Sequence, residues 1–341
     1  THNRRVPIEL TREVVTSRIL VPGEGGYQER QGRVEVRVDP LTGHSARLLG
    51  EGRLLPPSDF DLEAFGDQSR SWCPFCGERA TTATPMFPAE IHPEGRIRRG
   101  RALCFPNLAT YAKWSSVSIY GSDLHYLPLE RMTPRLVVDN LAAQVEFLRG
   151  AVSYDAAAPW VSLSANHMLP SGSSLFHPHM QGAVDPCPTT FQRLLAEVPA
   201  GRFAEYLATE KELRERYLGS TGSVEWLASF APVGFHELRA LVPGLSSPEQ
   251  LSDELAEELG TGLARALNLY AELGMQSFNM ALYGAPANAS GHVLNLRLVS
   301  RSNLQPQYRS DATYFERVHG TALIDTSPEE LARLAGDRFR R

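Results

Sequence analysis

No apolar run in this chain approaches the roughly 18 residues that a membrane-spanning helix needs. Cysteine is scarce, with four residues in 341, which argues against the dense disulfide framework of a secreted domain. Basic charge is not in excess, and the formal net charge of −5 argues against non-specific nucleic-acid binding. The first residues, including Arg4, Arg5 and Glu9, lack the apolar core of a signal peptide. We therefore expect a cytoplasmic protein that binds neither membranes nor nucleic acids.

The remaining composition is that of a soluble globular protein, because 42% of the residues are hydrophobic and 21% are charged. A chain of this length can build two hydrophobic cores. Apolar or alternating runs in the first half predict strands at 33–38, 115–120 and 161–164. Thr133 and Pro134 predict the start of a helix that Gly150 ends. This mixture of elements predicts an α+β fold.

The second half repeats this order of elements. After Pro186 and Pro188, a charged stretch from Thr190 to Leu218 is predicted to be helical, and its charges at 210–216 predict a solvated helix face. The elements predicted to follow are a strand at 224–230, a helix at 249–273 and strands at 276–283 and 292–299. Because the order recurs, we infer a duplicated unit.

Residues 171–181 form the most informative motif of the chain, a Gly/Ser turn followed by His-x-His-x-Gln. If the end of this segment is extended, His177, His179 and Gln181 project from the same face of a strand. A buried row of this kind is costly without a metal, a phosphate or hydrogen-bond partners, which favours a functional site. Two structural histidines beside a turn are the alternative.

Cys73 and Cys76 form a Cys-x-x-Cys pair, which is typical of half a zinc site, a redox pair or a zinc-ribbon knuckle. A ribbon requires a second close pair, but Cys104 and Cys187 are isolated. A thioredoxin-like pair opens a helix, whereas a Thr/Pro-rich loop follows this one. The pair therefore indicates a zinc site that takes two further ligands, for which histidines are the commonest donors.

The His-x-His-x-Gln segment resembles the active site of the galactose-1-phosphate uridylyltransferases, the transferase branch of the histidine-triad superfamily. The resemblance spans roughly residues 30 to 335 and is strongest in the first half. It implies that His177 is a metal ligand and that His179 is the nucleophile that takes a nucleotidyl group. Further segments similar to the family are residues 39–43 (Asp-Pro-Leu-Thr-Gly), 73–76 (the Cys pair), 106–107 (Pro-Asn), 121–125 (Gly-Ser-Asp-Leu-His) and Asn166.

The zinc ligands implied by the resemblance are Cys73, Cys76, His125 and His177. A Cys2His2 set fills all four tetrahedral positions, so the zinc is expected to be structural. His92 and His167 are the competing histidines, and the family pattern, rather than spacing, selects His125 over them.

The resemblance also implies substrate contacts. Asn107 and Asn166 are expected to contact the substrate, and Ser173 and Ser174 are plausible hydrogen-bond donors in the turn. The family's Arg-x-x-Arg-Pro motif is altered here. The chain retains Arg47 and then Arg53, which we expect to contact phosphate, Arg53 foremost. Solvent-exposed residues on a strand face are the equal alternative for both.

The second half departs from the family. The strand at 292–299 carries one histidine, His292, so we expect no second metal site. The segment 314–320 is similar to the family tail that reaches the sugar pocket, and its Glu316 and His319 are either pocket groups or surface polar residues.

The resemblance implies duplicated histidine-triad-like units with antiparallel sheets and packed helices. We expect an N-terminal arm at 1–30, a catalytic unit with the zinc site at 31–188, and a second unit at 189–341 that completes the substrate pocket. The expected assembly is a homodimer.

Three functions are compatible with these features. The first is a nucleotidyltransferase that uses a nucleotide sugar and a sugar 1-phosphate, with His179 as the nucleophile in a ping-pong reaction. Gln181 is expected to donate a hydrogen bond to a phosphoryl oxygen, since an amide cannot act as an acid. The second passes the same intermediate to inorganic phosphate or water, as in nucleotide-sugar and dinucleoside-polyphosphate phosphorylases. The third is a non-catalytic zinc-binding interaction module.

Overall fold

The computed structural model describes residues 8–50, 60–306 and 310–340. Over these residues, ten strands form one large sheet in which every neighbouring pair is antiparallel. In sheet order the strands are β4 (Ile97–Arg99), β5 (Ala102–Pro106), β6 (Trp114–Ile119), β8 (His179–Asp185), β7 (Trp160–His167), β12 (Ser277–Tyr283), β13 (Leu294–Arg301), β11 (Leu238–Val242), β10 (Val224–Ala228) and β9 (Tyr217–Thr221).

The two halves of this sheet repeat one pattern. Three strands, a long helix and two strands occur first as β4 to β8 around α3 (Pro134–Tyr154) and again as β9 to β13 around α6 (Asp253–Glu272). The halves join where β7 pairs with β12, so the sheet is continuous. The predicted α+β fold of duplicated units is therefore confirmed. The boundaries 1–30, 31–188 and 189–341 stay a prediction.

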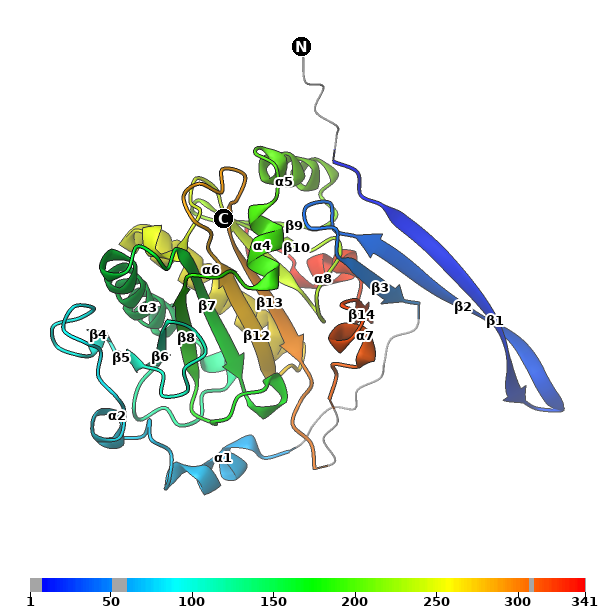
Figure 1. Ribbon diagram of the computed structural model, residues 1–341. Helices are drawn as coiled ribbons and strands as arrows, with labels where there is room; N and C mark the ends of the chain where they lie inside the picture. Colours follow the sequence, from blue (N-terminus) through cyan, green and yellow to red (C-terminus); the bar gives the residue numbers. More distant parts are fainter. Residues whose placement is uncertain (1–7, 51–59, 307–309, 341) are drawn as a thin grey trace, which may run out of the picture.

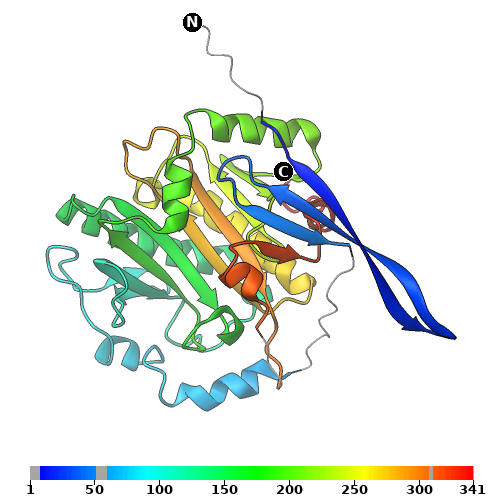
Figure 2. The ribbon, with the colours of Figure 1, turned by 45° about the vertical axis from the view of Figure 1, so that its right-hand side comes forward.

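Helices α3 and α6 pack side by side on one face of the large sheet (Figures 1 and 2). On the opposite face lies a second sheet of β1 (Arg12–Gly23), β2 (Gly26–Val38), β3 (Ser45–Leu49) and β14 (Ala322–Ile324), whose β1–β2 hairpin projects from the body. The remaining helices are α1 (Leu62–Arg70), α2 (Arg79–Thr82), α4 (Thr190–Ala196), α5 (Arg202–Leu213), α7 (Tyr314–Arg317) and α8 (Pro328–Ala335), with short 3-10 turns at Leu129–Arg131, Leu169–Ser171 and Pro248–Gln250. None of the helices in the described ranges combines the length and apolarity required to span a bilayer.

Two predicted helix limits are wrong. Helix α3 starts as predicted, with the Thr133 side chain capping it, but it continues past Gly150 to Tyr154. Gly150 instead allows the close approach of the Ile91 backbone, because a Cβ at position 150 would lie 2.4 Å from the carbonyl oxygen of Ile91. The predicted helix from Thr190 to Leu218 is divided into α4 and α5, and its last residues belong to β9.

The charges at 210–216 do not all form a solvated face. Glu210 and Arg216 are both fully buried and form an ion pair of 2.9 Å. Arg216 also pairs with Glu329 of α8, so it ties α5 to the C-terminal helix. The sequence pattern could not reveal this burial, because α8 lies more than a hundred residues away in the chain.

Candidate active site and metal centre

Strand β8 carries His179 at its first residue and lies between β6 and β7. The β7–β8 ladder pairs Ser164 with Gln181. Asn166 follows Ser164 by two residues and His179 precedes Gln181 by two, so Asn166 and His179 lie beside each other on one face of the sheet. This face is opposite to the one that α3 covers.

Four side chains meet at the start of this strand, which are Cys73, Cys76, His125 and His177. Their potential ligand atoms lie within 4.8 Å of one another. The Nδ1 atom of His177 is 3.7 Å from Sγ of Cys73 and 3.4 Å from Sγ of Cys76, and His125 Nδ1 is 3.1 Å from the latter. Tetrahedral zinc with bonds of about 2.0 to 2.3 Å holds its ligand atoms roughly 3.3 to 3.8 Å apart. The cluster therefore has nearly the dimensions that zinc requires.

The other ring nitrogen of each histidine faces a carbonyl oxygen. Nε2 of His177 lies 3.0 Å from the carbonyl of Gly121, and Nε2 of His125 lies 2.9 Å from that of Gly66. A carbonyl can only accept, so Nε2 carries the proton in each ring and Nδ1 presents its lone pair to the cluster. This is the tautomer that a metal-binding histidine needs.

Burial makes Cys73, His125 and His177 poor sites for charge in the absence of a cation. Burial raises the pKa of the Cys73 thiol to about 12 and lowers the pKa of His177 to about 3. It also lowers the pKa of His125. Two neutral imidazoles and two cysteine side chains, of which Cys73 is buried, suit a thiolate-binding cation such as zinc, which stabilises the thiolate form.

His179 is held in a different way. The residue is 8% exposed, and its Nδ1 lies 2.8 Å from the carbonyl oxygen of His177. Nδ1 therefore donates its proton, and the lone pair of the neutral ring is on Nε2. Burial lowers the pKa of His179, which favours this neutral form. Phe75, from the Cys-x-x-Cys turn, packs edge-on against the rings of both His177 and His179.

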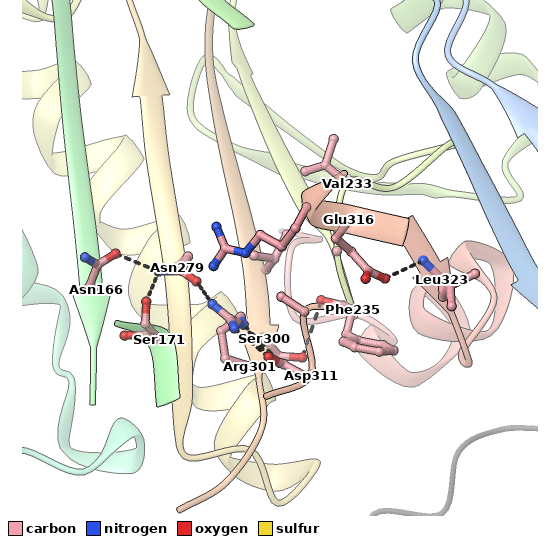
Figure 3. Close-up of a pocket in the computed structure, with 14 residues that line it drawn as sticks. Asn166, Ser171, Val233, Phe235, Asn279, Ser300, Arg301, Asp311, Glu316 and Leu323 are labelled. Atoms are coloured by element: carbon pink, nitrogen blue, oxygen red, sulfur yellow. Dashed lines mark hydrogen bonds and ion pairs between the residues drawn. The ribbon is translucent and has the colours of Figure 1, made fainter. Parts of the chain in front are cut away.

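A cavity of about 400 Å³ begins beside Asn166 (Figure 3). It reaches from the ends of β7, β12 and β13 to α7. Its polar wall contains Asn166, Asn279, Arg301, Asp311 and Glu316. The cavity therefore joins the end of β7, in the first half of the chain, to the C-terminal segment of the second half.

No family model matches the sequence. An uncharacterized protein of Archaeoglobus fulgidus is 31% identical over 334 residues, which cover 96% of this chain and 97% of that protein. The two chains belong to one family.

Solved structures show which fold this family has. An ADP-glucose phosphorylase from Arabidopsis thaliana with bound ADP-glucose superposes with a TM-score of 0.66 at 18% identity, over 89% of this chain and 98% of that one. A GalT-like protein of the same plant gives 0.65 at 16% identity, over 88% and 97%. A uridylyltransferase gives 0.60 at 20% identity, over 89% and 98%. The predicted resemblance to the galactose-1-phosphate uridylyltransferases is thus confirmed for the fold.

The predicted substrate residues lie in different parts of this fold and differ in exposure. Asn107 follows β5, and its side chain accepts a hydrogen bond from the Ala109 amide. Ser173 is buried and donates to the Leu175 carbonyl, whereas Ser174 is exposed. Arg47 lies on β3 with its guanidinium over the ring of Phe315 in α7. Arg53 lies outside the described residues. The contacts of all these residues with a substrate stay predictions.

The competing histidines are not part of the metal cluster. His92 faces Glu146 at 3.2 Å, and His167 stacks on Phe278. In the second half, Nε2 of His292 lies 3.0 Å from the Tyr283 carbonyl. Within the described ranges, the Cys73 cluster is the one group found that could hold a metal.

Sequence reasoning missed several polar residues of the cavity, namely Ser171, Asn279, Arg301 and Asp311. Asn279 and Arg301 sit on strands that read as ordinary members of the second unit, and Asp311 lies in a loop. No local spacing marks them, because β12 meets β7 only in the folded sheet.

Proposed function

We propose that this protein is a nucleotidyltransferase that moves a nucleoside monophosphate from a nucleotide sugar to a phosphate-bearing acceptor through a nucleotidyl-His179 intermediate. One observation carries the proposal. The His177 carbonyl holds the proton of His179 on Nδ1, so the lone pair of the neutral ring is on Nε2, and His179 lies beside Asn166, which lines a polar cavity. The fold shared with a uridylyltransferase and an ADP-glucose phosphorylase supports it.

In the first step, the Nε2 lone pair attacks the α-phosphorus of the donor. A P–N bond forms, the P–O bond to the bridging oxygen breaks, and the sugar 1-phosphate leaves with the electron pair. A phosphate leaving group needs little protonation, so no acid is required. The ring gains positive charge as it reacts, and the Nδ1–H···O=C bond to His177 stabilises that charge.

In the second step, an oxygen of the acceptor phosphate attacks the same phosphorus. The P–N bond breaks and the neutral His179 is restored, which completes a double displacement. Gln181 follows on the same face of β8 and is partly exposed, and we propose that its amide donates to a non-bridging phosphoryl oxygen.

The zinc in this proposal is structural. Cys73, Cys76, His125 and His177 would hold it as a closed set that leaves no position for substrate. Bound zinc would cross-link the Cys turn, the loop after β6 and the segment before β8. Because His177 supplies both a ligand nitrogen and the carbonyl that orients His179, the metal site and the nucleophile are mechanically coupled.

Inorganic phosphate is the second candidate acceptor. The ADP-glucose phosphorylase among the structural neighbours is similar over almost its whole length, and both reactions need the same intermediate. The two candidates therefore differ in the second step alone. A homodimer and a cytoplasmic location complete the proposal.

The decisive experiment is to incubate the protein with labelled nucleoside diphosphate sugars, including UDP-glucose and ADP-glucose. A nucleotidyl-histidine gives label on the protein that is stable to base and labile to acid. Discharge by glucose 1-phosphate or galactose 1-phosphate indicates a transferase, and discharge by inorganic phosphate indicates a phosphorylase. Absence of label with every donor would contradict the proposed function.

Gln181→His is expected to raise hydrolysis of the intermediate relative to transfer, by roughly tenfold, since an imidazole can act as a general base toward the attacking water and an amide cannot. The measurement is the single-turnover decay of labelled protein in buffer alone and with an acceptor. Gln181→Asn provides the matched amide control, which should not raise hydrolysis. If water discharges the wild-type intermediate as fast as any acceptor does, the protein is a hydrolase instead.

A further inference from the structure

A chain of hydrogen bonds runs from the C-terminal loop to the residue beside His179 (Figure 3). Asp311 accepts from Nε of Arg301 with both carboxylate oxygens, at 2.9 and 3.0 Å. Nη1 of Arg301 donates to Oδ1 of Asn279 at 2.6 Å, and Nδ2 of Asn279 donates to Oδ1 of Asn166 at 2.6 Å. The chain thus links β13, β12 and β7 across the floor of the cavity.

The donors and acceptors in this series of hydrogen bonds fix the direction of every bond. A guanidinium can only donate, so the atom of Asn279 that faces Arg301 is the oxygen. The amide nitrogen of Asn279 then points the other way, and its second hydrogen bond, to the Ser171 carbonyl at 2.9 Å, requires a donor there as well. Asn279 cannot reverse its amide without losing all three of these bonds.

The orientation of the Asn279 amide also fixes that of the Asn166 amide. Since Asn279 donates to it, Asn166 presents Oδ1 to Asn279, and its own Nδ2 hydrogens point away from Asn279. Asn166 lies beside His179 on the same sheet face and lines the cavity. A donor in this place faces a phosphoryl group on Nε2, whereas an amide oxygen there would repel the phosphoryl oxygens.

We propose that Asn279, held by the Arg301–Asp311 pair, is a positioning residue that keeps the Asn166 amide turned with its hydrogens toward the reacting phosphoryl group. The inference rests on the proposed function and deepens it. Asn279 touches neither the nucleophile nor the phosphorus in this account, and it acts through Asn166. The substrate group recognised is an anionic phosphoryl oxygen.

The inference predicts an unusual order of labelling rates among variants of Asn279. In Asn279→Asp, the carboxylate still accepts from Arg301, but it can only accept from Asn166, whose amide must reverse and present its oxygen to the phosphoryl group. In Asn279→Ala, Asn166 is free to adopt either orientation. We expect the rate of protein labelling to fall about tenfold in Asn279→Ala and about a hundredfold or more in Asn279→Asp. A purely structural role predicts the reverse order, because aspartate is nearly isosteric with asparagine.

A double-mutant cycle separates this effect from repulsion at the Ser171 carbonyl, which Asn279→Asp also faces. If the effect runs through Asn166, then Asn279→Asp and Asn279→Ala should label at equal rates in an Asn166→Ala background. A penalty of Asn279→Asp that persists there would overturn the inference. Equal labelling rates of Asn279→Asp and Asn279→Ala in protein that retains Asn166 would overturn it too. Melting temperature and zinc content of each variant identify any that is misfolded.

A readout without substrate distinguishes failure of this inference from failure of the proposed function. In protein labelled with ¹⁵N-asparagine, the Asn166 side-chain NH2 signals are assigned by their loss in Asn166→Ala. These hydrogens should exchange rapidly with solvent in the wild type and become protected in Asn279→Asp. If no donor labels the wild type, the proposed function fails. An unchanged Asn166 signal in Asn279→Asp would refute the orientation in either case.

Discussion

Replacing His179 by alanine is expected to reduce nucleotidyl labelling and transfer by about 10⁴-fold or more, because the variant has no atom that can form the P–N bond. Zinc content and melting temperature should be close to those of the wild type. The candidate metal cluster presents Nδ1 of His177 and His125, whereas His179 lies outside it and donates a hydrogen bond to the His177 carbonyl. Labelled transfer, metal analysis and thermal unfolding measure the three quantities.

His92→Ala is the matched control for this variant. His92 is a histidine of the same half of the chain that faces Glu146 and lies outside the metal cluster, so its removal should leave labelling intact. Full transfer activity in His179→Ala would refute the mechanism. Loss of zinc from His179→Ala, with zinc retained in His177→Ala, would show that the roles of the two histidines are exchanged.

Replacing Cys73 by serine is expected to remove zinc and to destabilise the fold by several kcal/mol, about 3 to 5, because a buried metal cross-link is lost. The side chain is 1% exposed, so the new hydroxyl is also buried. We expect the melting temperature to fall by roughly 5 to 15 °C. Labelling should fall with it, since the Cys turn carries Phe75, which packs on the His179 ring.

Cys187→Ser provides the control, because Cys187 is exposed and lies outside the cluster, so its replacement should change neither zinc content nor stability. Wild-type protein should contain one zinc per chain by elemental analysis. A Cys73→Ser variant that keeps a full equivalent of zinc would contradict the ligand assignment. A labelling rate that recovers on adding zinc to chelated wild-type protein would support the coupling between metal and nucleophile.

Local signals in the sequence were enough for the parts of the site that depend on short segments. The Cys-x-x-Cys and His-x-His motifs identify three of the four clustered side chains. Residues two or three apart in a turn or a strand remain neighbours in any fold that contains that turn or strand. The choice of His125 over His92 and His167 came from the family resemblance, and the cluster agrees with it. The repeated order of elements was also visible, since each unit carries its own hydrophobic periodicity.

Tertiary structure decided what depends on contacts between distant segments. Gly150 resembles a helix stop in the sequence, yet the helix continues past it. The close approach of the Ile91 carbonyl explains why a glycine is needed at this position. Glu210 and Arg216 look like surface charges, yet α8 completes their burial.

The same holds for the cavity that begins at Asn166. Asn279 carries no motif, and the role proposed for it follows from the pairing of β12 with β7 and from the donor and acceptor that face it. Residue type and spacing can identify a chemical group. The burial of that group, its partners and the direction of its hydrogen bonds depend on the packed chain. Each of them requires a neighbouring residue that is distant in the sequence and is brought close only by folding.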